Sequence, residues 1–196
     1  MEQVTGFVGR AREAEQALEA IRRGKSILVK GRAGIGKSAF LRHVQQRLET
    51  DAPVFWFAHG SVKPALDELA RQVHDVLGIA LPAAALGPRL TARLQREGGL
   101  PWSSLARTVG RMPSSQVAEA IVEALRKRRC VVFLESLEVP PTQAELFAEL
   151  LEVAQVVGAM DDTNRRTRIE RLVWRFTEMV ELKPLALEHC EQIAEA

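Results

Sequence analysis

One octapeptide, Gly31-Arg32-Ala33-Gly34-Ile35-Gly36-Lys37-Ser38, constrains the fold of this chain more than any other stretch. It matches the pattern G-x-x-x-x-G-K-[ST]. It also lies between an apolar run, residues 26–30, and a segment that has Phe40 and Val44 on one helical face. A buried strand followed by this loop and then by a helix is the context in which the pattern binds phosphate. The sequence therefore predicts an α/β domain built around a phosphate-binding loop.

The residue types of this loop suit a nucleotide polyphosphate. Gly31, Gly34 and Gly36 lack the Cβ atom that would obstruct a close backbone approach or disfavour positive φ. Consecutive backbone N–H groups and the start of the next helix then attract the anion. Lys37 supplies a mobile charge for the β- and γ-phosphates, and Ser38 supplies a hydroxyl for Mg²⁺. The expected nucleotide-binding residues of the loop are Gly31, Arg32, Ala33, Gly34, Ile35, Gly36, Lys37, Ser38 and Ala39.

Composition places the chain among ordinary globular proteins. Its 196 residues, 46% of them hydrophobic and with a net charge of +2, suffice for one sizeable domain. Cys130 and Cys190 have no CxxC spacing and no neighbouring His cluster, so they indicate neither zinc nor a disulfide scaffold. The N-terminus lacks the apolar stretch of a signal peptide, and no apolar run reaches membrane-spanning length. These features predict a cytoplasmic protein.

Apolar runs alternate with amphipathic segments along the chain. We expect strands at residues 26–30, 53–57, 130–134, 153–159 and 179–182, with helices before, between and after them. Continuous apolar strands that alternate with helices indicate a parallel sheet covered on both faces. The expected fold is therefore a three-layer α/β sandwich with a five-stranded parallel sheet. We expect residues 1–183 to form this core and residues 184–196 to begin a further helix or form a C-terminal tail.

Residues 81–113 interrupt the alternation, because proline and glycine divide them into short pieces. The segment has a basic excess, with one acid, Glu97, against five arginines: Arg89, Arg93, Arg96, Arg107 and Arg111. A solvated surface insertion and an element that contacts nucleic acid both fit this pattern, since phosphate contacts need only Arg or Lys. A second basic run is Arg126-Lys127-Arg128-Arg129. We prefer to explain it as cations that complement the dipole at a helix C-terminus rather than as a nucleic acid contact.

A second part of the site is expected where residues 131–134 end. In such folds the acid that holds Mg²⁺ through water follows an apolar strand beside the first strand. Glu135 directly follows four apolar residues and is the only good candidate, although an ordinary strand can also end in a surface glutamate. We therefore predict Ser38 and Glu135 on the metal side of the nucleotide.

Several short motifs, taken in order, resemble those of the AAA+ and STAND ATPases. They are Phe7-Val8-Gly9-Arg10, the phosphate-binding loop, Val131 to Glu135, Trp174-Arg175-Phe176 and Val180-Glu181-Leu182-Lys183-Pro184-Leu185. The resemblance covers nearly the whole chain and implies the strand order 5-1-4-3-2. It implies that Val8, Gly9 and Arg10 lie near the adenine. It also implies that Asn164 or Thr163 is the polar sensor after the fourth strand.

The same resemblance implies a role between subunits for Arg175. Such proteins offer an arginine from this position to the γ-phosphate bound by the neighbouring subunit. Rivals for this role on the same segment are Arg165, Arg166, Arg168 and Arg171.

Two departures from the family pattern bear on activity. The family usually has Asp at the position of Glu135 and a second acid directly after it, where this chain has Ser136. The second acid normally polarises the attacking water. Either Glu135 or Glu138 therefore substitutes as the base, or hydrolysis is slow. The family continues into a helical lid, whereas the chain stops at Ala196, so the resemblance implies that residues 184–196 begin a lid helix or form a C-terminal tail. We expect a fragment, a minimal member, or a subunit whose lid comes from a partner.

The resemblance implies an ATPase that binds ATP and Mg²⁺, forms homo-oligomers and assembles on a partner. The favoured partner is duplex DNA, as for transposition regulators and helicase loaders, with a partner protein as a further expectation and no membrane. Two alternatives stay open. One is a STAND-type nucleotide switch with little or no hydrolysis. The other is a small-molecule kinase in which residues 81–113 close over the substrate.

Overall fold

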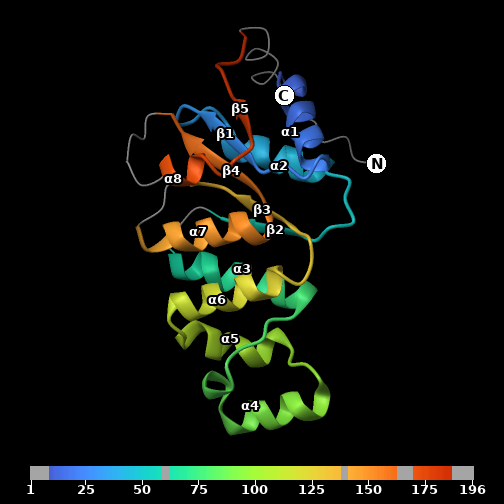
Figure 1. The fold of residues 1–196 in the computed structure, drawn as a ribbon, viewed down its shortest axis with the longest axis vertical. Coiled ribbons are helices and arrows are strands. Elements are labelled where there is room, and N and C mark those ends of the chain that lie inside the picture. Colours follow the sequence, from blue (N-terminus) through green and yellow to red (C-terminus); the bar gives the residue numbers. More distant parts are fainter. Residues whose placement is uncertain (1–8, 59–61, 138–140, 163–169, 187–196) are drawn as a thin grey trace, which may run out of the picture.

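Five parallel strands form one sheet at the centre of the protein (Figure 1). The computed structural model describes residues 9–58, 62–137, 141–162 and 170–186. The strands are β1 (Ile27–Gly31), β2 (Val54–Phe57), β3 (Val131–Leu134), β4 (Gln155–Asp161) and β5 (Glu178–Glu181). Their order is β2-β3-β4-β1-β5, with every neighbouring pair parallel. This is the predicted order 5-1-4-3-2 read from the opposite edge, so the fold prediction is confirmed.

Helices cover both faces of this sheet. They are α1 (Ala11–Arg22), α2 (Lys37–Arg47), α3 (Val62–Leu77), α4 (Ala83–Glu97), α5 (Trp102–Arg111), α6 (Ser114–Leu125), α7 (Pro141–Val153) and α8 (Glu170–Val173). α1 and α2 pack with one set of strand side chains, and α3, α6 and α7 pack with the opposite set. The result is the predicted three-layer sandwich.

Strand β3 shows why the central strands read as continuous apolar runs. Val131 and Phe133 pack toward α1 and α2, whereas Val132 and Leu134 pack toward α3, α6 and α7. All four side chains are buried, because each face of a central strand is covered by helices. The preceding Cys130 is also buried, and this burial raises the pKa of its thiol to about 11. Cys130 is thus a small residue of the core.

Residues 81–113 contain two ordered helices, α4 and α5, rather than short pieces. The prolines and glycines that break the sequence pattern mark helix boundaries. Pro101 is the N-cap of α5, and Gly98 closes α4 in a left-handed conformation at φ 69°. Only Gly87, with φ 69° and ψ 167°, interrupts α4 internally and kinks it. Leu105 and Val109 of α5 are buried in the same core as α3 and α6.

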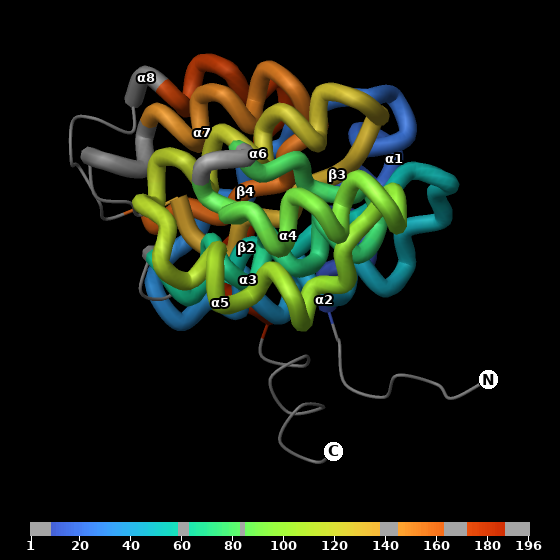
Figure 2. Tube along the Cα trace, turned by 90° about the horizontal axis from the view of Figure 1, so that it is seen from below, coloured from blue at the N-terminus to red at the C-terminus, as the bar shows by residue number. Residues whose placement is uncertain are grey.

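These two helices form an extra layer outside the sandwich. Figure 1 places α4 at one end of the long axis and β1 with α2 at the other. Viewed from the α4 end in Figure 2, α4 and α5 lie in front of the remaining elements. The segment that interrupts the sequence pattern therefore lies far from the phosphate-binding loop. None of the helices in the described ranges has both the length and the hydropathy needed to cross a bilayer.

Candidate functional site

The predicted phosphate-binding loop joins β1 to α2 at the carboxyl end of the sheet. Gly34 has φ 76°, and Gly36, the N-cap of α2, has φ 93°. Both values lie in the region that side chains with a Cβ atom adopt at a cost. Gly31 is needed for a different reason. A Cβ atom there would stand 2.8 Å from Cγ2 of Ile35 and 3.0 Å from the carbonyl oxygen of Leu182.

Lys37 begins α2 and folds back over the loop. Its Nζ donates hydrogen bonds of 2.9 Å to the carbonyl oxygens of Gly31 and Arg32. A carboxylate oxygen of Asp161 lies 3.8 Å from the same nitrogen, and both side chains are largely buried. These contacts hold the ammonium group against the loop, where it can turn toward phosphate oxygens. The contact with the β- and γ-phosphates that the loop pattern predicts for Lys37 stays a prediction.

Asp161 is a site residue that the sequence interpretation missed. It pairs with Gly31 in the register of β4 and β1, so its backbone lies beside the start of the loop. The expected fourth strand ended at Ala159, whereas β4 continues through Met160 to Asp161. An apolar run followed by an acid is the pattern that identified Glu135. Applied to residues 156–161, the same pattern would have identified Asp161.

Glu135 ends β3 on the same edge. The strand before this acid was expected to lie beside the first strand, but β4 lies between β3 and β1, so that part of the expectation is wrong. Its backbone N–H donates to the carbonyl oxygen of Phe57 at 3.0 Å, which continues the ladder of β2 and β3 by one residue. Its carboxylate is 15% exposed and lies 3.8 Å from the guanidinium of Arg42. Arg42 stands one helical turn after Ser38 on α2. Glu135 therefore faces the beginning of the helix that carries the predicted metal ligand.

The guanidinium of Arg42 also lies over the ring of Trp56, 5.6 Å from its centroid. Trp56 stacks in turn on Phe133 of β3, with 5.7 Å between ring centroids. Aromatic faces attract a guanidinium through their negative charge density. Arg42 is thus held between a ring and a carboxylate, close to the predicted metal-side acid.

The donor atoms at this edge fit Mg²⁺. The Ser38 hydroxyl and the carboxylates of Glu135 and Asp161 are hard oxygen ligands, the class that Mg²⁺ prefers. Mg²⁺ usually keeps several waters and takes only one or two protein ligands beside the phosphates. The sparse donor set suits an ion that arrives with a nucleotide, and Ser38 and Glu135 are the residues that would hold it.

Arg10 is almost fully buried, with 4% of its side chain exposed, and it braces the loop. Its Nη2 donates to the carbonyl oxygen of Ile35 at 3.2 Å and to that of Lys183 at 3.0 Å. Glu13 lies 3.9 Å from Nη1. The guanidinium therefore ties the phosphate-binding loop to the first residues after β5. The adenine contact expected of Gly9 and Arg10 stays a prediction.

We expect Arg10→Ala to weaken ATP binding about tenfold, because the loop loses a charged hydrogen-bond donor behind it. Hydrogen exchange at residues 34–36 and 182–186 should rise together, since one guanidinium holds both segments. Glu13→Gln is the matched control, because it leaves both carbonyl contacts in place. Unchanged affinity and unchanged exchange in Arg10→Ala would show that the contact does not position the loop.

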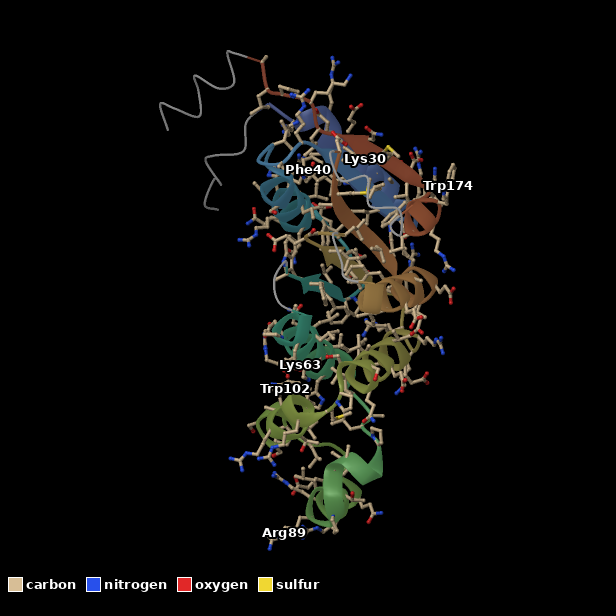
Figure 3. The ribbon with its side chains drawn as sticks, turned by 90° about the vertical axis from the view of Figure 1, so that its left-hand side faces the viewer. Lys30, Phe40, Lys63, Arg89, Trp102 and Trp174 are labelled. Atoms are coloured by element: carbon tan, nitrogen blue, oxygen red, sulfur yellow. The ribbon has the colours of Figure 1, made fainter. Side chains whose placement is uncertain are left out.

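Arg175 lies at the opposite edge of the sheet from its own phosphate-binding loop. It precedes β5, whereas the loop follows β1, and the two strands are parallel neighbours. Its guanidinium bonds the Glu152 carboxylate at 2.6 Å and the Ala148 carbonyl at 3.2 Å, both on α7. The adjacent Trp174 is 87% exposed and projects from this edge (Figure 3). Arg175 therefore cannot serve the nucleotide of its own chain.

Several predicted site residues lie outside the described residues, and their roles stay predictions. They are Val8, Glu138, Thr163, Asn164, Arg165, Arg166 and Arg168. The side chain of Arg171 is likewise outside the description.

The five arginines of the predicted nucleic-acid-binding segment divide between α4 and α5. Arg93 bonds Glu97 at 2.8 Å and Ser104 at 3.1 Å, so its charge is partly neutralised within the chain. The other four side chains are exposed: Arg89, Arg96, Arg107 and Arg111.

Comparison with known proteins assigns the chain to a family. The family model described as "AAA ATPase domain" matches residues 6–182, which is nearly the whole chain. No match was found among the curated proteins.

Solved structures with a similar fold include a Pif1 helicase from Candida albicans, at 16% identity and a TM-score of 0.45 over 92% of this chain. A STAND ATPase with a tetratricopeptide repeat sensor from Pyrococcus horikoshii has 18% identity and a TM-score of 0.42 over 99% of the chain. A structure of Pif1 helicases at forked duplex DNA has 18% identity and a TM-score of 0.41 over 90%. The chain spans 41%, 26% and 44% of these three chains, respectively. Likenesses of this strength do not bear on function.

Proposed function

This chain belongs to the AAA ATPase domain family, and we propose that it uses ATP and Mg²⁺ to assemble with copies of itself on duplex DNA. One observation carries the nucleotide part of the proposal. Lys37 and Asp161 lie at a glycine-lined loop, and Glu135 ends β3 on the same carboxyl edge of the sheet. This is the edge at which α/β folds bind their ligands.

Each residue of this edge has a role that its chemistry supports. The backbone N–H groups of the loop bind phosphate oxygens, and Lys37 exchanges its two carbonyl partners for the β- and γ-phosphates. Ser38 and Glu135 would hold Mg²⁺, and the ion would neutralise charge on the phosphates. Asp161 keeps the ammonium of Lys37 directed toward the site. Among the described residues, Glu135 is the acid to which we assign the proton of the attacking water.

Assembly would bring Arg175 of one copy to the nucleotide of the next. Two features support this step: its position at the edge opposite its own loop, and the exposed Trp174 beside it. A largely exposed tryptophan is the kind of side chain that anchors protein interfaces. Its bond to Glu152 is a surface ion pair, which adds little stability and is readily exchanged.

We expect Arg175→Ala to leave ATP affinity of the isolated subunit unchanged and to return the hydrolysis rate of the assembled protein to that of the single subunit. The arginine would stabilise charge on a nucleotide bound by another copy, so only the assembled state can lose activity. Glu152→Gln is the control, because it frees Arg175 without removing it. Assembly-stimulated hydrolysis that persists in Arg175→Ala would exclude this residue from the shared site.

The mass of the protein in solution tests the proposed function. Light scattering after size exclusion would compare the protein alone, with ATP and Mg²⁺, and with duplex DNA added. The proposal predicts a larger species only with ATP, further stabilised by DNA, and none for Lys37→Ala. A single-subunit mass under all conditions would contradict it.

A nucleotide switch with little turnover is the second candidate, and Ser136 favours it. This residue stands where the family usually has the acid that polarises water, and it carries no carboxylate. Steady-state phosphate release separates the two functions. Turnover stimulated by DNA supports the assembly factor, and tight ATP retention without turnover supports the switch. The kinase alternative loses its support, because α4 and α5 lie away from the loop and do not cover it (Figure 1).

A further inference from the structure

Two basic segments that are far apart in sequence meet at the amino edge of the sheet, opposite the nucleotide site. The turn at residues 22–25 precedes β1, and the run at residues 126–129 precedes β3. Because β1 and β3 are parallel and flank β4, both segments lie at the same edge. A Cβ atom on Gly24 would stand 2.9 Å from Nη2 of Arg129, so the two segments are in contact.

A buried glutamine holds this edge in place. Gln155, at the start of β4, is 8% exposed, and its Nε2 donates at 2.8 Å to the carbonyl oxygens of Ile21 and Lys25. The hydroxyl of Ser26 accepts a bond of 3.0 Å from the N–H of Val156. The basic turn is thus fixed to the sheet at three points and is an ordered surface.

Part of the positive charge at this edge is balanced within the chain. Glu19 pairs with both Arg22 and Arg23, at 3.6 Å and 2.8 Å. Lys25 bonds Glu178 and thereby lowers the pKa of that carboxyl. Glu123 lies 3.7 Å from Arg126.

Three exposed cations make no such pair. Lys127, Arg128 and Arg129 form no ion pair with any residue in the described part of the chain. α6 ends at Leu125, and only Arg126 occupies its C-cap. Helix-dipole stabilisation falls off within the last turn, so it explains Arg126 alone. The three residues beyond the cap need another reason for their charge.

This basic edge continues toward α4. Lys127 lines a hollow of about 280 Å³ together with Gly98 and Gly99, the two residues that follow α4. Arg96 lies in the last turn of α4, and Arg89 lies at the far end of the molecule (Figure 3). On the other side, Glu49 and Asp51 share a hollow with Arg128 and Arg129 and bound the basic surface there.

We propose that the phosphate backbone of a nucleic acid lies along a basic track formed by Arg129, Arg128, Lys127, Arg96 and Arg89, which begins beside the turn at residues 22–25. The proposal deepens the proposed function, because it assigns the surface that contacts DNA and extends it from α4 to the amino edge of the sheet. Phosphate contacts need only cations. The track and the phosphate-binding loop lie at opposite edges, so nucleic acid and ATP do not compete for one surface.

The composition of the track favours nucleic acid over an acidic protein. Protein interfaces have an apolar core with aromatic anchors. Among the described residues, the large exposed hydrophobic side chains are Val76, Trp174 and Met179, and none of them belongs to the track. A surface of arginine and lysine without such anchors suits a phosphate backbone.

Salt-dependent binding to a 30-base-pair duplex, followed by fluorescence anisotropy, tests the track. We expect Lys127→Gln/Arg128→Gln to weaken binding about tenfold at 0.1 M salt and to reduce the slope of log K against log salt by about two. Arg89→Gln/Arg96→Gln should have a comparable effect. The control Arg12→Gln/Arg71→Gln removes the same charge from α1 and α3, outside the track, and should leave the slope unchanged. Lys127→Arg/Arg128→Lys should retain binding.

Three results would overturn the track. The first is a slope for Lys127→Gln/Arg128→Gln equal to that of the unchanged protein, with ATP binding and melting temperature retained. The second is loss of DNA binding in Arg89→Gln/Arg96→Gln but not in Lys127→Gln/Arg128→Gln. That result would show that DNA contacts α4 and does not contact the amino edge of the sheet. The third uses polyglutamate as a probe for an acidic protein: the track would be wrong if Lys127→Gln/Arg128→Gln lost polyglutamate binding but kept DNA binding. The mass measurement with ATP alone does not depend on these variants, so it judges nucleotide-driven assembly separately.

Discussion

Lys37→Ala is expected to reduce ATP affinity about a thousandfold, because it removes two charge-assisted hydrogen bonds to the phosphates at about 1.5–3 kcal/mol each. In the structure the ammonium group is already held at the loop by the carbonyl oxygens of Gly31 and Arg32. Its replacement by a methyl group leaves the loop backbone intact but without a mobile cation. Isothermal titration calorimetry with ATP and Mg²⁺ measures the change.

The matched control for this prediction is Lys183→Ala. That lysine follows β5 near the same edge, and the contact it makes with Arg10 uses its backbone carbonyl, which the substitution keeps. The control should bind ATP as the unchanged protein does. Undiminished binding by Lys37→Ala would mean that the nucleotide is held elsewhere, and the site assignment would be wrong.

Glu135→Gln should lower the rate of phosphate release about a thousandfold while ATP affinity changes only a few-fold, the range expected when a general base is lost. The amide retains the size of the side chain and its oxygen, but it neither accepts a proton nor neutralises Mg²⁺. Steady-state phosphate release at saturating ATP, with duplex DNA present, gives the rate.

Glu145→Gln provides the comparison, since it makes the same change at an exposed position on α7. Turnover that survives in Glu135→Gln would move the base to another acid, with Glu138 the remaining candidate from the sequence. A protein that binds ATP tightly but shows no turnover before any substitution would be a switch rather than a working ATPase.

Features that depend on neighbours in the sequence were predictable. The loop and Glu135 each follow an apolar strand directly, so local pattern alone located them, and the alternation of strands and helices gave the sheet. The strand order came from the resemblance of the motifs to a family. The structure confirms the fold, and Lys37 donates to a carbonyl oxygen of the loop, while its role at the phosphates stays a prediction.

Features that depend on contacts between distant segments were not predictable. Arg10 reaches Ile35 and Lys183, which lie 25 and 173 residues away, and no local pattern encodes such contacts. Asp161 was missed because the end of β4 was placed two residues too early. Residues 81–113 were expected to form short pieces rather than α4 and α5. The reason is that the proline and glycine at the helix ends and at the Gly87 kink are also the residues typical of loops.

The contact between the two basic segments at the amino edge of the sheet was not predictable from local sequence either. The run at residues 126–129 is visible in the sequence, but its contact with the turn at Gly24 follows only from the strand order. A helix-end explanation was reasonable for the run alone. Three cations beyond the end of α6 are better explained by a surface that two distant segments build together.

A crystal structure of the protein with Mn²⁺ in place of Mg²⁺ and a slowly hydrolysed ATP analogue tests the central claim most directly, because Mn²⁺ is located by its anomalous scattering. The account predicts the triphosphate on the backbone of residues 31–38, with Mn²⁺ bound directly to Ser38 Oγ and connected to Glu135 through a coordinated water. A nucleotide bound away from this loop, or a metal ion with neither Ser38 nor Glu135 beside it, would contradict the account.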